Sequence, residues 1–186
     1  MNLYVALLRG INVGGNNIIK MADLAACFAG LGLHRVRTYI QSGNVIFGAD
    51  EPAPANLVGL LEGALSGAFN YNSTVVLRSH AAMQAVVAQA PDGFGGEPDV
   101  YRYDVIFLKE PLTSAEAMNW VSAKEGVDQI NAGDGVLYAS RLISRASQSR
   151  LAKIVSSPVY RSLTIRNWNT TTKLLHMLDS AANVNG

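Results

Sequence analysis

One order of secondary-structure signals, β-α-β-β-α-β, occurs twice along this chain of 186 residues and constrains its fold more than any other feature. In the first half, apolar or alternating runs predict strands at 3–8, 35–40, 45–47 and 74–78, and helical spacing predicts helices at 21–31 and 56–69. In the second half, the same signals predict strands at 103–108, 127–130, 136–139 and 163–166, and helices at 113–124 and 147–155. Each half matches the split βαβ, or ferredoxin-like, arrangement. We therefore predict an α+β protein with two ferredoxin-like βαββαβ halves in tandem, a connecting helix at 81–89 and a C-terminal helix at 170–178.

The stretch 91–98 separates the two halves, because it holds three glycines and two prolines. This predicts a first subdomain over residues 1–90, which includes the connecting helix, and a second over residues 99–186, which includes the last helix. Within each half, a right-handed crossover makes the first two strands parallel, and the third strand lies between them. In the first half, this topology places the loop of residues 9–20 and the turn of residues 41–44 at the same end of the sheet.

Three of the predicted helices begin beside side chains that are suited to capping. Ser79 precedes the connecting helix, and Thr113 with Glu116 has the spacing of a capping box. Asn167 or Asn169 is the predicted cap of the last helix.

Donor groups are concentrated in the 9–20 loop and the 41–44 turn. Arg9 offers a planar fork of donors suited to a carboxylate or phosphate, and the glycines allow backbone amides to approach a ligand. We predict a site for a small anionic or nucleotide-like ligand there, formed by Arg9, Asn12, Gly14, Gly15, Asn16, Lys20, Gln41, Ser42 and Asn44. The alternative is structural, because tight turns also need asparagine and glycine, and Arg9 would then tie the loop to the turn. The spacing matches neither the P-loop nor the dinucleotide fingerprint.

A second polar segment ends the last strand and opens the last helix. Arg166, Asn167 and Asn169 are its candidate ligand-binding residues, since helix N-termini attract anions. The alternative is an ordinary helix cap with Trp168 as a packing residue. Topology does not determine whether Arg166 and Asn169 reach the 9–20 loop.

The net charge of +1 conceals a skew along the chain. Between Asp50 and Asp134 there are twelve acidic and four basic residues, whereas residues 140–178 hold seven basic residues and no acidic one. Such a skew is compatible with an anionic partner or with a solvated face. A nucleic-acid-binding module that uses the basic C-terminal region is therefore a second hypothesis, with Tyr39, Phe47, Tyr103 and Phe107 as the strand aromatics available for stacking. A protein-interaction scaffold is a third.

Several classes of site are not indicated by the sequence. The single cysteine, Cys27, permits no internal disulfide, and its apolar neighbours favour a core role over a nucleophile. His34, His80 and His176 lack ligand spacing, so we predict no metal site and no cofactor. No acid–base pair or catalytic triad can be assigned from residue order, so the sequence does not decide whether the protein is an enzyme. Because no signal peptide or membrane span is evident, we expect a cytoplasmic protein without a membrane partner. The oligomeric state is not decided either.

Three ordered sequence blocks resemble the signature of a bacterial family known as domain of unknown function 1697. The blocks are Leu-Leu-Arg-Gly-Ile-Asn-Val-Gly-Gly-Asn-Asn at 7–17 with Ile-Lys-Met at 19–21, Arg-Thr-Tyr-Ile-Gln-Ser-Gly-Asn-Val-Ile-Phe at 37–47, and Thr-Ile-Arg-Asn-Trp-Asn-Thr at 164–170 followed by Thr-Lys-Leu at 172–174. The resemblance extends over essentially the whole chain. It implies a bacterial source and a two-part α/β protein, and it brings no catalytic residues.

Overall fold

The computed structural model describes residues 1–12, 15, 17–50, 54–70 and 72–183. The chain divides into two compact units, one made of Met1–Gln84 with Lys173–Gly186 and the other of Ala85–Thr172. Each unit contains one four-stranded antiparallel sheet. The predicted α+β fold of two ferredoxin-like halves with a C-terminal helix is therefore confirmed. The prediction grouped the last helix with the second half, whereas its residues from Lys173 onward belong to the unit of the first sheet.

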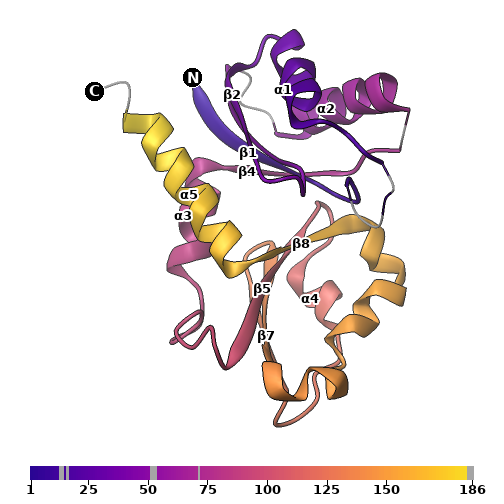
Figure 1. The fold of residues 1–186 in the computed structure, drawn as a ribbon, viewed down its shortest axis with the longest axis vertical. Helices are drawn as coiled ribbons and strands as arrows, with labels where there is room; N and C mark the ends of the chain where they lie inside the picture. The colour runs from indigo at the N-terminus through magenta and orange to yellow at the C-terminus, as the bar shows by residue number, and fades with distance from the viewer. Residues whose placement is uncertain (13–14, 16, 51–53, 71, 184–186) are drawn as a thin grey trace. The chain divides into compact units, whose positions relative to one another are not determined.

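The first sheet contains β1 (Asn2–Leu8), β2 (His34–Tyr39), β3 (Asn44–Ala49) and β4 (Val75–Ser79) in the order β2-β3-β1-β4 (Figure 1). Because β3 is antiparallel to both of its neighbours, β1 and β2 are parallel with β3 between them, as the topology predicts. Helices α1 (Met21–Gly30) and α2 (Pro54–Phe69) cover one face of this sheet. Their core contacts come from Leu24 and Phe28 of α1 and from Leu57, Leu61 and Leu65 of α2.

The second sheet contains β5 (Tyr101–Leu108), β6 (Asp128–Gly133), β7 (Val136–Leu142) and β8 (Leu163–Asn167) in the equivalent order β6-β7-β5-β8. One face holds a core of alternate apolar residues, including Ile106, Leu137 and Leu163. Ala117 of the short helix α4 (Ser114–Met118) and Ile154 pack onto this core. The capping box of Thr113 and Glu116 is confirmed, because each side chain bonds the backbone amide of the other residue.

The helix predicted over 113–124 is shorter than expected, since α4 ends at Met118. Beyond it the chain forms tight turns, with amides bonded three residues back, such as Trp120 to Ala117 and Val121 to Met118. Further along, the Lys124 amide donates to Asp128 Oδ2 at 3.0 Å instead of continuing a helix. Tight turns and a local hydrogen bond between residues four apart in sequence therefore replace the last turns of the predicted helix.

The α-helix predicted over 147–155 is wrong. The structure has three short 3₁₀ segments there, η1 (Ile143–Gln148), η2 (Leu151–Ser156) and η3 (Pro158–Ser162). The Arg150 amide donates to Asp128 Oδ2 at 2.8 Å, so it is not available to an α-helical carbonyl, and Ser149 is extended. Asp128 therefore interrupts the predicted helix.

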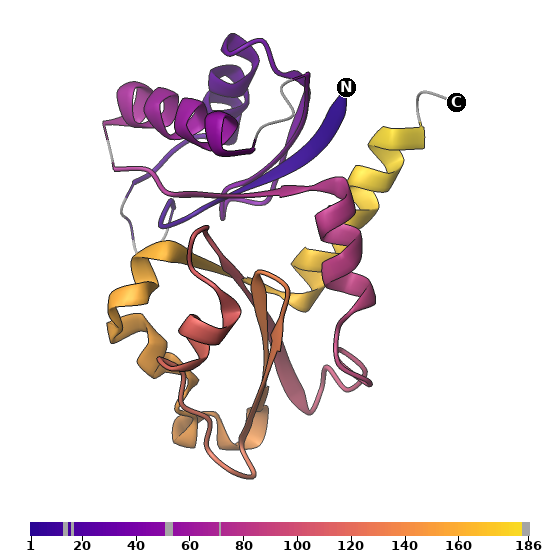
Figure 2. The same cartoon turned by 180° about the vertical axis from the view of Figure 1, so that it is seen from behind.

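Two further helices complete the structure, α3 (His80–Ala88) and α5 (Trp168–Asn183). Figure 2 shows them side by side, and His80 Nε2 lies 2.6 Å from Asp179 Oδ1 between them. Ser79 caps α3, because its hydroxyl accepts a bond from the Ala82 amide at 3.1 Å. Asn167 caps α5, because its Oδ1 accepts a bond from the Thr170 amide at 2.7 Å. Both predicted caps are confirmed.

Candidate functional site

A cavity of about 460 Å³ lies where β5 begins and where β7 and β8 end. This volume is within the range of small-molecule sites. The walls come from the 91–98 connection, three strands, η1 and the first turn of α5. We call it the arginine cavity, and its lining residues are Gly95, Pro98, Arg102, Tyr103, Arg141, Ile143, Ala146, Asn167, Trp168 and Asn169.

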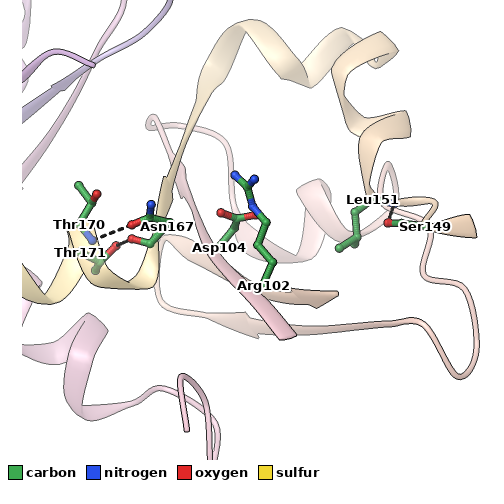
Figure 3. Close-up of polar contacts among 7 residues, drawn as sticks. All are labelled: Arg102, Asp104, Ser149, Leu151, Asn167, Thr170 and Thr171. Carbon is green, nitrogen blue, oxygen red and sulfur yellow. Dashed lines mark hydrogen bonds and ion pairs between the residues drawn. The ribbon is translucent and has the colours of Figure 1, made fainter. Parts of the chain in front are cut away.

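Strand register places the two arginines of the cavity together. Arg102 of β5 is the direct cross-strand partner of Arg141 of β7, so both side chains leave the same face of the sheet. Like charges in directly opposite positions destabilise a sheet unless other charges compensate them. Asp104 provides part of that compensation, because its Oδ2 accepts a bond from Arg102 Nε at 2.8 Å (Figure 3).

Two polar atoms of this charge cluster are buried without a hydrogen-bond partner among the described residues. They are Arg141 Nε and Asp104 Oδ1. A buried polar group without a partner is costly, so the cluster has donor and acceptor capacity that the protein itself leaves unused.

Asp128 is the other carboxylate beside the arginines, and it is the cross-strand partner of Arg141. It is only 6% exposed. Burial raises the pKa of Asp128, but hydrogen bonds from Ser149, Arg150 and Lys124 and the charge of Arg141 outweigh burial and leave its pKa below the ordinary value. Asp128 therefore stays ionised at neutral pH and fixes the start of η2 through the Arg150 amide.

Aromatic side chains form another wall of the arginine cavity. The Trp168 and Phe94 rings form a T-shaped pair with centroids 5.1 Å apart, and Phe94 forms another T-shaped pair with Tyr103 at 4.9 Å. Gly95 adopts a φ of +85°, and a Cβ at this position would overlap the Trp168 indole. Gly95 is therefore required both for its backbone conformation and for the close approach of Trp168.

The predicted residues of the second polar segment do not all lie at this cavity. Asn167 and Asn169 line it, and Asn167 also caps α5 (Figure 3). Arg166 leaves the opposite face of β8 from Asn167, because strand residues alternate. It is 7% exposed and donates through Nη1 to the Thr164 hydroxyl and the Ile165 carbonyl. Burial lowers the pKa of the Arg166 guanidinium to about 10.

The predicted meeting of the 9–20 loop and the 41–44 turn is confirmed. The Leu8 amide donates to the Gly43 carbonyl at 2.8 Å, and Asn12 Nδ2 donates to the Gln41 carbonyl at 2.9 Å. Asn12 also bonds the backbone of Ile19, with its Oδ1 accepting at 2.8 Å and its Nδ2 donating at 3.0 Å. The Asn12 side chain is therefore engaged in holding the loop closed.

Asn44 has a similar structural role in the turn, because it is fully buried and donates to the Tyr39 carbonyl and the Ser42 hydroxyl. Lys20, Gln41 and Gly15 are exposed, and Arg9 is half-buried. Gly14 and Asn16, also predicted for this site, lie outside the described residues.

Arg102 and Arg141 are the candidate residues that sequence reasoning missed. One sequence signal for them was available at the start of the strand at 103–108. Arg102 and Asp104 alternate there with Tyr101 and Tyr103, and a buried strand rarely begins with charged residues on one face. The pairing of Arg102 with Arg141 depends on a register between strands that are distant in sequence, so no local pattern contains it.

Other chemistries receive less support. Among the described residues, no group of three or more His, Cys, Asp or Glu side chains is arranged to hold a metal ion. Burial raises the pKa of the Cys27 thiol, and Cys27 packs against the first core, so its predicted core role fits its surroundings. No helix within the described part of the chain has the length and apolar character needed to cross a membrane.

Comparison with known proteins supports the resemblance seen in the sequence. The family described as "Protein of unknown function (DUF1697)" matches residues 1–138. The solved structure of conserved bacterial protein SP0830 from Streptococcus pneumoniae is similar over 95% of this chain and 98% of that one, with a TM-score of 0.82 and 31% sequence identity. A comparison with curated proteins found no match. With a family match over most of its length, the chain belongs to the DUF1697 family of proteins of unknown function.

Proposed function

We propose that the protein binds a small anionic molecule in the arginine cavity. The observation that carries this proposal is the register that sets Arg102 directly opposite Arg141 in the wall of a cavity of about 460 Å³. Guanidinium groups bind carboxylates and phosphates through paired, charge-assisted hydrogen bonds. An anion between them would also relieve the repulsion of the two like charges.

Neighbouring groups support the same ligand class. Asn169 lies in the first turn of α5, a helix of 16 residues whose N-terminus is a favourable place for negative charge. Trp168 and Tyr103 offer ring surface to an apolar part of the ligand. The cavity therefore suits a small molecule with a carboxylate or phosphate at one end.

Binding of inorganic phosphate and AMP tests this proposal. Either ligand at a hundred times its dissociation constant should stabilise the protein by about 2.7 kcal/mol, which a thermal-shift assay detects. Arg141→Gln should weaken the response by about tenfold in affinity, because a charge-assisted hydrogen bond is lost. Arg145→Gln is the matched control, since Arg145 is an exposed arginine of η1 outside the cavity lining. If Arg141→Gln and Arg145→Gln were stabilised equally by phosphate and AMP, the anion would not bind in the arginine cavity.

The 9–20 loop remains a second predicted anion site. Arg9 and Lys20 supply its positive charge. Because Asn12 and Asn44 bond the backbone of the loop and turn, Arg9 and Lys20 are the main candidate ligand-binding residues there. Arg9→Ala in the same assay tests it. Loss of the anion response in Arg9→Ala, with Arg141→Gln unaffected, would favour the loop over the arginine cavity.

Nucleic-acid binding is the alternative proposal. Three exposed basic residues of the η1–η2 region support it, because such residues contact phosphates. They are Arg145 of η1, Arg150 between η1 and η2, and Lys153 of η2. Phe47 and Phe107, however, are fully buried, so two of the four strand aromatics predicted for stacking are not accessible. A salt titration with mixed RNA and DNA separates the proposals, since nucleic-acid binding weakens steeply with salt. The interaction scaffold is a third proposal, for which an exposed apolar patch would be the evidence.

A further inference from the structure

A second, smaller pocket of about 220 Å³ lies beside the other face of the second sheet. Tyr101 and Tyr103 alternate with Arg102 and Asp104 along β5, so their side chains leave the face opposite the arginine pair. Gln129 and Ser140 continue the pocket across β6 and β7, and the 91–98 connection closes it. We call it the tyrosine pocket.

Three aromatic rings are grouped at this pocket. Tyr101 and Tyr103 have ring centroids 6.1 Å apart and planes tilted by 47°, and Phe94 meets Tyr103 edge-on at 4.9 Å. Tyr103 is held in place because its hydroxyl accepts a bond from the Glu97 amide at 3.3 Å. Tyr101 and Tyr103 are both only half-buried, so ring surface remains accessible to a ligand.

The charge of this pocket is opposite to that of the arginine cavity. Asp92 and Glu97 of the 91–98 connection line it, and among its described lining residues none is basic. Rings beside carboxylates are the environment that recognises cations with an organic shell, because the ring faces and the carboxylates are both negative.

A metal ion is a poorer fit than an organic cation. Divalent ions take several carboxylate, imidazole or thiolate ligands, and no group of three such side chains occurs among the described residues. We infer that the tyrosine pocket binds a small organic ammonium group, with Tyr101 and Tyr103 contacting its carbon shell and Asp92 and Glu97 balancing its charge. Tyr103 lines both cavities, whereas Tyr101, Asp92 and Glu97 line only the tyrosine pocket, so variants of these three residues test this inference separately from the anion site.

Choline and its neutral analogue 3,3-dimethyl-1-butanol test the inference on the full chain. The two molecules have nearly the same shape and differ in the charge of the quaternary centre. We expect choline to bind at least about fivefold tighter in an NMR or calorimetric titration, because only choline makes cation–π contacts. Equal affinity of the two molecules, or no choline binding, would overturn the inference.

Variants of the pocket locate the binding. Tyr101→Leu keeps apolar volume but removes a ring, and it should weaken choline binding about two- to fivefold. Glu97→Gln should also weaken it, whereas Asp99→Asn, an exposed acid close in sequence but outside the pocket lining, should not.

If Tyr101→Leu does not fold, the comparison of Glu97→Gln with Asp99→Asn decides alone. Equal effects of Glu97→Gln and Asp99→Asn would mean general charge attraction and would contradict the inference. Phosphate binding should be the same in all three variants.

Discussion

Arg102 and Arg141 stand directly opposite each other on the antiparallel strands β5 and β7, with Asp104 bonded to Arg102 and Asp128 beside Arg141. The arrangement places two positive charges at the cavity and one carboxylate next to each. The Arg102 side chain is 54% exposed and that of Asp104 is 21% exposed, so solvent screens this ion pair. The carboxylates position the arginines, and they also compete with any anion for them.

Asp104→Asn should have opposite effects on stability and on anion binding. The loss of a partly exposed ion pair should lower the free energy of unfolding by less than about 1 kcal/mol. Phosphate affinity should rise several-fold, because Arg102 then has no carboxylate competitor. Urea unfolding measures the first effect and phosphate titration the second. Weaker phosphate binding in Asp104→Asn would contradict the assignment of the anion to the arginine pair.

Asn12→Gly should destabilise the first unit by about 1–3 kcal/mol. The substitution removes three side-chain hydrogen bonds, to the Ile19 amide, the Ile19 carbonyl and the Gln41 carbonyl, and buried Ile19 loses its partners. Glycine is the appropriate replacement, because Asn12 has a φ of +52° that alanine would strain. Gln41→Ala is the control: it keeps the backbone carbonyl that Asn12 bonds, so chemical denaturation should show a change within about 0.5 kcal/mol.

Gly43→Ala should be more damaging than Gly10→Ala. Both glycines have left-handed backbones, with φ of +77° and +71°. At Gly43 a Cβ would lie 2.7 Å from Ile11 Cδ1 and 2.9 Å from Leu8 Cβ, whereas at Gly10 it would meet no described atom within 4 Å. Backbone strain alone should cost Gly10→Ala about 1–2 kcal/mol, and overpacking should add about 1–3 kcal/mol at Gly43. Equal losses in thermal unfolding would show that the loop rearranges to relieve the overlap.

Asp128 should make stability depend on pH in the acid range. Its folded-state pKa lies below the ordinary 3.8, so its stabilisation is present above about pH 4 and is lost as pH falls through the folded pKa. Asp128→Asn should lower the free energy of unfolding at pH 7 by about 1–3 kcal/mol, because charged hydrogen bonds to two backbone amides are weakened.

Urea unfolding between pH 2.5 and 7 measures this effect. The gap between wild type and Asp128→Asn should narrow as the pH falls below about 4. Asp134→Asn, an exposed acid in the β6–β7 turn, is the control and should leave both the stability and its pH profile nearly unchanged. A gap that stays constant with pH would mean that Asp128 acts by packing and not by charge.

Much of the fold was predictable because its signals are local. Apolar, β-branched or alternating runs located the eight strands of the described residues, and capping chemistry located the starts of α3, α4 and α5, since a cap depends on residues within one turn. The meeting of the 9–20 loop with the 41–44 turn followed from the handedness of crossovers, which is common to proteins in general.

Both helices that differ from prediction have a backbone amide bonded to the buried carboxylate of Asp128. The Arg150 amide lies inside the helix predicted over 147–155, whereas the Lys124 amide lies at the last residue of the helix predicted over 113–124. Periodicity over residues 147–155 contains no information on that competition, because the bond to Arg150 forms only when Asp128 of β6 lies beside this segment.

Local sequence patterns are enough to establish the α+β class, the duplicated topology and the polar end of the first sheet, because these depend on periodicity, turn chemistry and chain handedness. The roles of the polar residues emerge only once the chain is folded. Asn12 and Asn44 hold a loop and a turn, Arg166 is buried, and Arg102 and Arg141 share a cavity. Those roles depend on register and burial, which bring together residues about forty positions apart and separate neighbours such as Arg166 and Asn167 onto opposite faces.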